Sequence, residues 1–160
     1  MMDVSRTILT TLVSEFSDLT DVEQATRVAL RLLLAALLGG LLGYERETHG
    51  KAAGIRTHML VCTGAALFVL GSELVGGGDD AMSRVVQGIV AGIGFLGAGT
   101  IIKGDSMHDV KGLTTAAGVW MTAAVGVCVG LGLEATAVLA TLLMLFILNI
   151  LPRFDSISKD

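Results

Sequence analysis

The chain has 160 residues, of which 52% are hydrophobic and 16% charged, and its formal net charge is −4. Soluble domains carry about 25% charged residues, whereas here the charges sit in short clusters between long apolar blocks. This composition excludes an ordinary water-soluble domain and favours a protein that crosses a bilayer several times. No basic cluster is dense enough to predict binding to nucleic acid.

Residues 1–20 are predicted to form an amphipathic surface helix. Apolar side chains recur there at helical spacing, and Ser, Thr and acidic side chains fill the other face. The helix is expected either to lie on the membrane surface or to pack on the helix bundle, and the pattern fits both. The apolar set is Val4, Ile8, Leu9, Leu12, Val13, Phe16 and Leu19.

Five apolar runs follow, each near the length of about 20 helical residues that the hydrocarbon core requires. The first starts at a capping-box pattern, Thr20 to Glu23, and extends to Gly43. The other four are residues 59–75, 85–102, 113–129 and 135–151, and Pro152 is expected to end the last helix. The fold class is therefore an all-α polytopic membrane bundle, with a transmembrane domain at 21–152 and a short cytoplasmic tail at 153–160.

Lysine and arginine in the loops predict the orientation, because basic residues concentrate on the cytoplasmic side. The loop 45–56, the loop 103–112 and the C-terminal tail each hold at least two basic residues. The loop after Val75 holds only Arg84, and the turn around Glu134 holds none. We therefore expect the N-terminus outside and the C-terminus in the cytoplasm.

The third apolar run is unusually rich in glycine, with Gly88, Gly92, Gly94, Gly97 and Gly99. Glycine disfavours a helix by about 1 kcal/mol relative to alanine, which close packing of bare backbones can offset. Two interpretations remain open: helix packing, within the chain or across a dimer, or an unwound or re-entrant stretch that exposes carbonyls to an ion.

The segment from Glu45 to His58 carries the largest charge cluster, with Glu45, Arg46, Arg56, Thr57 and His58 as candidate residues. One interpretation is simple anchoring at the membrane interface. The other is a structured hairpin, held by pairing of Glu45 with Arg46 or Arg56, that presents a surface to a partner. Histidine beside carboxylates also allows pH sensing, whereas a cation site is poorly supported because oxygen ligands are too few.

Further polar candidates lie within the apolar runs. Arg31 is predicted to pair with Glu73, because ionisable groups in a membrane normally face partners; the alternative is that these side chains snorkel to the interface. Core packing is expected for Trp120. The candidate polar residues in the outer half of the membrane are Arg27, Arg31, Glu73, Arg84 and Gln87. The candidates in the fourth apolar run are Thr114, Thr115 and Trp120.

Four stretches resemble the MgtC/SapB family of bacterial inner-membrane proteins: residues 43–46 with 56–58, 84–87, 92–101 and 110–120. The resemblance implies a small multi-pass protein of the inner membrane, not an established enzyme, linked to low magnesium, acid stress and survival in macrophages. The virulence-type branch is held to contact other membrane proteins, notably ATP synthase. That branch has Asn at the position of Thr114, Cys at that of Met121, and a soluble C-terminal domain. The present chain is therefore expected to be a minimal member.

Two hypotheses about function follow. The first is a regulatory or interaction protein that forms a homodimer through glycine faces and binds another membrane protein, such as ATP synthase. The second is a small channel or carrier for Mg²⁺, K⁺ or H⁺ along Gly94, Gly97 and Gly99. An enzyme is not expected, because the sequence has no nucleophile–base pair and no metalloprotease motif; no catalytic residue, metal or cofactor is predicted.

Overall fold

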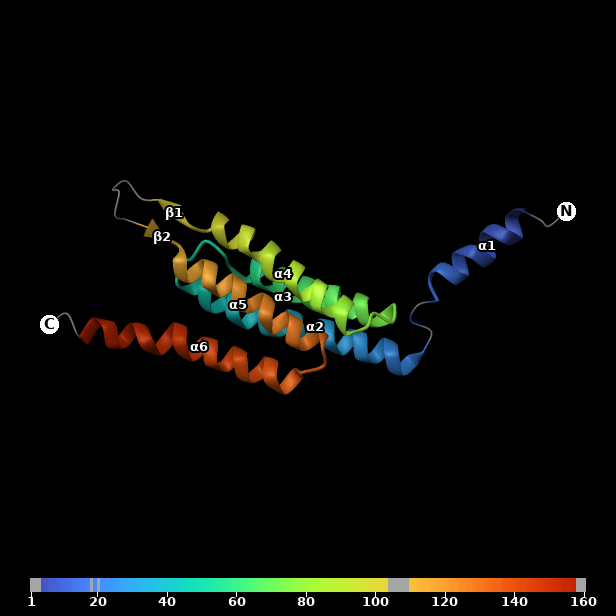
Figure 1. The fold of residues 1–160 in the computed structure, drawn as a ribbon. Helices are drawn as coiled ribbons and strands as arrows, with labels where there is room; N and C mark the ends of the chain where they lie inside the picture. The colour runs from blue at the N-terminus through green and yellow to red at the C-terminus, as the bar shows by residue number, and fades with distance from the viewer. Residues whose placement is uncertain (1–3, 18, 20, 104–109, 158–160) are drawn as a thin grey trace. The chain divides into compact units, whose positions relative to one another are not determined.

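A computed structural model describes residues 4–17, 19, 21–103 and 110–157, and the side chains of 102–103 and 151–157 lie outside this description. The chain divides into two compact units, Met1–Leu30 and Arg31–Asp160. Figure 1 shows the elements: α1 (Val4–Glu15), α2 (Val22–Thr48), α3 (Ile55–Leu74), α4 (Asp79–Gly99), β1 (Ile102–Lys103), β2 (Val110–Lys111), α5 (Leu113–Gly130) and α6 (Glu134–Ile157).

Helices α2, α3, α4 and α5 are long and apolar enough to cross a membrane. The fifth predicted span lies in α6, whose described apolar part, Glu134–Ile150, is shorter than the other four. These elements confirm the predicted all-α membrane bundle, with four spans of full length. Between α4 and α5, where a loop was predicted, the short strands β1 and β2 pair antiparallel with Ile102 opposite Lys111.

The first long helix does not end at Gly43, as the sequence predicts, but continues to Thr48. Gly43 serves packing instead, since a Cβ there would lie only 2.5 Å from the Cα of Ile55. The end of the helix is capped at Gly50, whose φ of 64° is left-handed. The Gly50 amide donates to Glu47 O and the Lys51 amide to Arg46 O, both at 3.0 Å, which is a Schellman cap. Glu45 and Arg46 therefore belong to the helix and not to the loop.

Two other predicted ends differ from the structure. Helix α6 continues past Pro152 to Ile157, because a proline removes one backbone hydrogen bond without forcing the helix to stop. Thr20, the predicted cap of α2, lies outside the described residues. A cap comes instead from Asp21, whose Oδ1 accepts the Glu23 amide at 3.1 Å.

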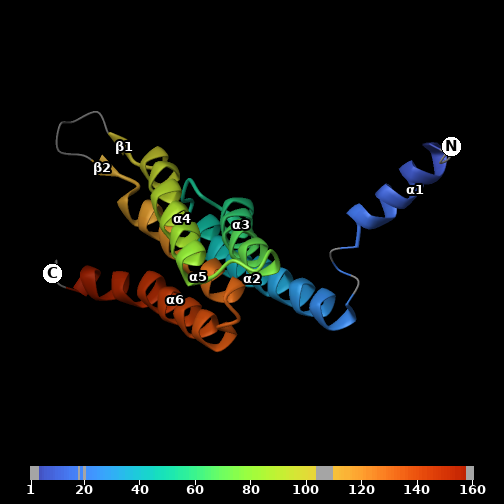
Figure 2. The same ribbon diagram turned by 45° about the vertical axis from the view of Figure 1, so that its right-hand side comes forward.

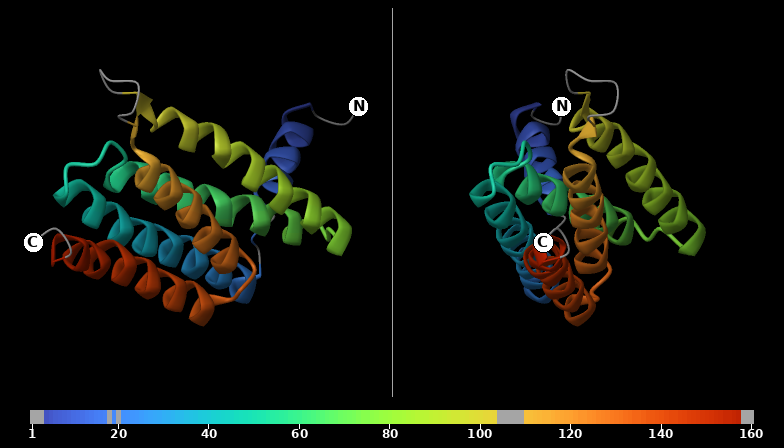
Figure 3. Two further views of the ribbon diagram at one scale, coloured as in Figure 1. Left: turned by 60° about the vertical axis from the view of Figure 1, so that its left-hand side comes forward. Right: turned by 90° about the vertical axis from the view of Figure 1, so that its left-hand side faces the viewer.

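Helix α5 forms the centre of the Arg31–Asp160 unit, since it packs against α3, α4 and α6, and α3 also contacts α2. A Cβ at Gly39 of α2 would lie 2.6 Å from the carbonyl oxygen of His58, and one at Gly130 of α5 would lie 2.7 Å from Cβ of Val69. Two pairs of glycines spaced four residues apart, Gly39/Gly43 of α2 and Gly126/Gly130 of α5, therefore bring backbones together. Helices α4 and α6 lie on opposite sides of this centre (Figures 2 and 3).

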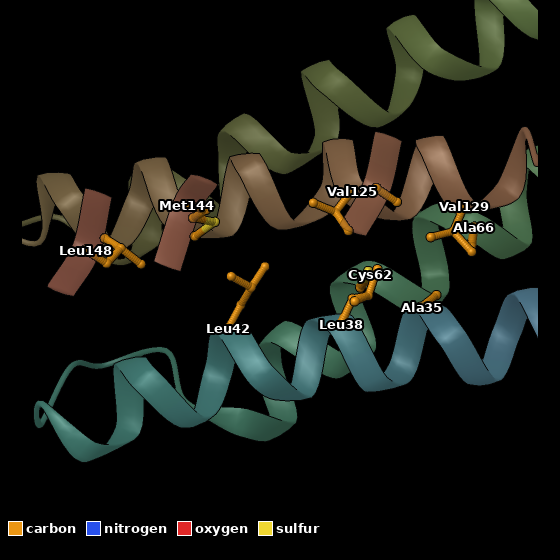
Figure 4. Packing of buried hydrophobic residues seen from close by; sticks show 10 residues of the cluster. Ala35, Leu38, Leu42, Cys62, Ala66, Val125, Val129, Met144 and Leu148 are labelled. Carbon is orange, nitrogen blue, oxygen red and sulfur yellow. The ribbon is translucent and has the colours of Figure 1, made fainter. Parts of the chain in front are cut away.

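The main buried cluster joins four helices, as Figure 4 shows. It is built from small and aliphatic side chains, which suits close helix packing where lipid supplies no hydrophobic drive between helices. Its buried members are Ala35, Leu38 and Leu42 of α2, Cys62 and Ala66 of α3, Val125 and Val129 of α5, and Ala137, Met144 and Leu148 of α6.

Candidate functional site

The end of α2 holds a buried ion pair between two adjacent residues. Glu45 is 6% exposed and Arg46 is 3% exposed. Arg46 donates from Nη2 to Glu45 Oε1 at 2.9 Å and from Nε to Oε2 at 2.5 Å, so that both carboxylate oxygens are satisfied. The predicted pairing of Glu45 thus falls on Arg46, and Arg56 is exposed.

Neighbouring polar groups fix the turn that follows α2. His49 Nδ1 lies 2.8 Å from the carbonyl oxygen and 3.1 Å from Oε1 of Glu45. Glu47 Oε2 accepts the Ile55 amide at 2.9 Å and so binds a free N–H of the first turn of α3. The segment is therefore a structured hairpin whose polar side chains bond to one another and to its own backbone.

His58 is fully buried on α3 and aims one nitrogen at the point where four helices meet. Its Nδ1 lies 3.0 Å from Gly54 O, and a carbonyl only accepts, so Nδ1 carries a proton. Its Nε2 has no partner among the described residues. A Cβ at Gly118 of α5 would lie 3.8 Å from Nε2, 4.0 Å from Arg46 Cδ and 3.4 Å from Met144 Cε. Because Gly118 has no side chain, Arg46 of α2, His58 of α3 and Met144 of α6 can approach one another beside it.

Some of the residues predicted to face a partner are buried and others are exposed. Glu45, Arg46, His58 and Thr115 are buried, so a protein outside the bundle does not reach them. Trp120, expected in the core, is 47% exposed, because it borders a shallow groove of about 190 Å³ between α4 and α5. The other exposed members are Arg56, Thr57 and Thr114.

At the opposite end of the bundle, Arg31 links four helices through its side chain. Its Nη1 donates to Glu73 Oε2 at 2.8 Å and to Gly130 O at 2.9 Å, and its Nε lies 3.6 Å from Glu134 Oε1. The predicted pair of Arg31 with Glu73 is therefore confirmed. Arg31 ties α2 to α3, to the end of α5 and to the start of α6.

Other charges predicted at this depth do not join that cluster. Arg27 pairs with Glu23 one helical turn away, at 2.8 Å. Arg84 and Gln87 are exposed on α4.

Helix α4 is continuous from Asp79 to Gly99, so the unwound stretch considered for this segment is absent. Only Gly97 is buried, with Ala116 of α5 at 3.6 Å from a Cβ placed on it. Figure 3 shows α4 leaning away from α5 toward its N-terminal end. Nothing described lies within 4 Å of a Cβ at Gly88, Gly92, Gly94 or Gly99.

Sequence reasoning missed three contributors, for a physical reason. Gly118 and Met144 shape the space beside His58, and Glu134 adds a second carboxylate near Arg31. Each of them meets its neighbours only through the packing of helices distant in sequence. Glu134 alone gave a signal, as an acidic residue in a turn free of lysine and arginine.

Comparison with known proteins identifies the family. The family model described as MgtC family matches residues 32–157. The chain belongs to the MgtC family.

Among the described residues, no group of three or more His, Cys, Asp or Glu is placed to hold a metal ion.

Curated relatives extend this result. The chain is 51% identical over 111 residues to Protein MgtC of Brucella abortus, covering 69% of this chain and 45% of the relative. It is 48% identical over 116 residues to Protein MgtC of Salmonella typhimurium, covering 72% and 48%. Protein SrpB of Synechococcus elongatus is 41% identical over 143 residues, covering 82% and 78%. The chain thus spans less than half the length of these MgtC relatives, and no solved structure matches it.

Proposed function

We propose that this protein regulates other membrane proteins by binding them within the bacterial inner membrane, in adaptation to low magnesium or acid. The supporting observation is the character of α4, the helix that a transport hypothesis would make the ion path. It is an unbroken helix flanked by two apolar grooves, one against α3 and one against α5. A conducting path needs carbonyls, charged rings or similar groups that replace water around the ion, whereas apolar, closely approachable helix faces suit association.

The surface that we assign to the partner is the α4–α5 face around Trp120. Its groove is lined wholly by apolar residues and Trp120 is half-exposed; a large aromatic side chain is a common anchor in interfaces. A second copy of the chain or a subunit of ATP synthase are the partners that the family resemblance suggests testing first.

The arrangement of the loops supports the orientation with the start of α2 outside and the end of α6 in the cytoplasm. The α2–α3 turn, the β1–β2 hairpin and the end of α6 lie at one end of the Arg31–Asp160 unit (Figures 1 and 3). These are the basic segments of the sequence, so the positive-inside rule places that end in the cytoplasm.

The decisive test of regulation against transport is flux through purified protein in sealed liposomes. We expect no saturable flux of Mg²⁺, K⁺ or H⁺. Gly94→Leu is the informative variant, because no described atom lies within 4 Å of a Cβ at Gly94, so we expect the substitution to leave the bundle intact. Saturable flux that Gly94→Leu abolishes would establish a carrier or channel in place of our proposal.

A photo-crosslinking amino acid at Trp120 tests the partner surface directly in cells. We expect a crosslinked membrane protein, identified by mass spectrometry. The matched control is the same amino acid at Leu139, which is also exposed but lies on α6, across the bundle from α4. Equal crosslinking from both positions, or none from Trp120, would contradict the assignment.

A further inference from the structure

The larger groove, between α3 and α4, has a volume of about 610 Å³ and an open floor of glycine. Gly64 of α3 and Gly88 and Gly92 of α4 line it, and no described atom lies within 4 Å of a Cβ at any of the three. Leu60 and Phe68, 74% and 67% exposed, form its outer wall on α3. The groove is therefore apolar along most of its lining and open to the outside of the bundle.

Arg84 is the only charged residue among those that line this groove. It is exposed and has no ion pair among the described residues. Asp80 stands four residues earlier, a spacing at which helical ion pairs form, but no contact between them falls within 4.0 Å. Near the start of α4, at one end of the apolar groove, Arg84 thus places a guanidinium without an ion pair in the described part of the chain.

The volume of the groove and the charge of Arg84 together indicate what kind of molecule fits there. Pockets for small ligands measure about 300–1,000 Å³, which includes this groove. In a symmetric dimer the same patch faces itself, so a second copy packed through this groove would offer Arg84 no anionic partner, because no described residue that lines the groove is acidic. The groove therefore fits a molecule with a negative group at one end and a slender apolar body.

We propose that the α3–α4 groove binds an anionic phospholipid, with its phosphate on Arg84 and one acyl chain along Gly88 and Gly92. Arginine and phosphate form paired, charge-assisted hydrogen bonds, a contact that depends on the guanidinium and not on the side of the membrane. The acyl chain gains little by leaving the surrounding hydrocarbon, because both places are apolar. Selectivity for this lipid therefore depends on the phosphate contact and on the fit of the chain over bare glycine.

The test measures phosphatidylglycerol retained on the full chain, purified in detergent, by native mass spectrometry. Phosphatidylcholine with the same acyl chains is the neutral comparison. We expect the wild type to retain one phosphatidylglycerol. Arg84→Gln should weaken retention about fivefold, which corresponds to about 1 kcal/mol. Gly92→Leu should remove retention by filling the floor, and Asp80→Asn should strengthen it.

Two control variants separate a site from the general lipid shell. Arg56→Gln removes an exposed arginine on another helix, and Gly94→Leu adds the same bulk to α4 outside the groove. Both should retain phosphatidylglycerol as the wild type does. Retention unchanged in Arg84→Gln, equal loss in the controls, or a copurified protein that Arg84→Gln and Gly92→Leu release while the lipid stays, would each overturn the proposal. None of these results depends on whether the protein regulates a partner.

Discussion

The buried residues Glu45 and Arg46 compensate each other's charge at the end of α2. Removing two charges from water is expensive, and the mutual attraction and hydrogen bonds repay this only when both partners are present. The bidentate contact meets that condition. His58, whose Nε2 has no partner among the described residues, lies across the same junction, so this end of the bundle concentrates polar groups that depend on one another.

Arg46→Ala should therefore destabilise the protein strongly, by about 3–5 kcal/mol, because Glu45 would remain buried and unpaired. The measurement is thermal loss of monodisperse protein in detergent. Arg56→Ala is the control, since Arg56 is exposed and a surface change is expected to stay within about 0.5 kcal/mol. Similar midpoints for the two variants would show that the Glu45–Arg46 pair is not what stabilises this end.

Arg31 should matter more than either of its acidic partners. It bonds Glu73 and Gly130 O and lies near Glu134, and only a small part of its side chain is exposed. Arg31→Ala is expected to destabilise by about 1.5–3 kcal/mol, the range for hydrogen bonds to charged groups. Glu73→Gln should stay within about 1 kcal/mol, because Glu73 is half-exposed. The same thermal assay decides, and a larger loss from Glu73→Gln would contradict this ranking.

At the scale of whole helices, glycine acts in two opposite ways in this protein. On α2 and α5 it lets backbones meet α3, whereas on α4 most glycines meet nothing described. The spacing in sequence is the same for Gly39/Gly43 and for Gly88/Gly92. Sequence therefore predicts that glycine is available for packing, and only the neighbouring helices determine whether it is used.

A matched pair of alanine substitutions tests this difference. Gly39→Ala would place its Cβ 2.6 Å from His58 O and 2.8 Å from Cys62 Cβ, and overpacking of this kind destabilises by about 1–3 kcal/mol. Gly94→Ala has open space and should stabilise α4 by about 1 kcal/mol, the difference in helix propensity. Thermal midpoints that shift in the same direction for both variants would refute the distinction.

Helix type and order were predictable because hydropathy and the need to satisfy backbone hydrogen bonds in lipid leave little choice. The ends were less predictable: α2 continues through Gly43 because that glycine faces Ile55, a contact between separate helices. Of the candidate site, the pair Arg31–Glu73 followed from charge and depth, whereas the sequence left Glu45 to pair with either Arg46 or Arg56. The burial of Thr115 and the exposure of Trp120 did not, because each depends on where α4 and α6 lie against α5.

At the scale of the whole molecule, the orientation in the membrane determines which surfaces meet which compartment. Alternation of basic and poorly basic loops requires an odd number of crossings between the start of α2 and the end of α6. The structure supports this by gathering the basic segments at one end of the Arg31–Asp160 unit (Figure 1). If either α3 or α4 alone failed to cross, Lys51 and the β1–β2 hairpin would no longer share a compartment.

Single cysteines in a Cys62→Ala, Cys128→Ala background, labelled with a membrane-impermeant maleimide, measure this arrangement. Val75→Cys should react in intact cells, because Val75 is highly exposed in the turn after α3, at the end that we propose faces outside. Lys51→Cys and Val110→Cys should react only after permeabilisation, because basic loops are retained in the cytoplasm. Both positions are exposed, so burial does not explain a lack of labelling in intact cells. Labelling of Lys51→Cys in intact cells, or opposite behaviour of Lys51→Cys and Val110→Cys, would show that the helices cross the bilayer differently.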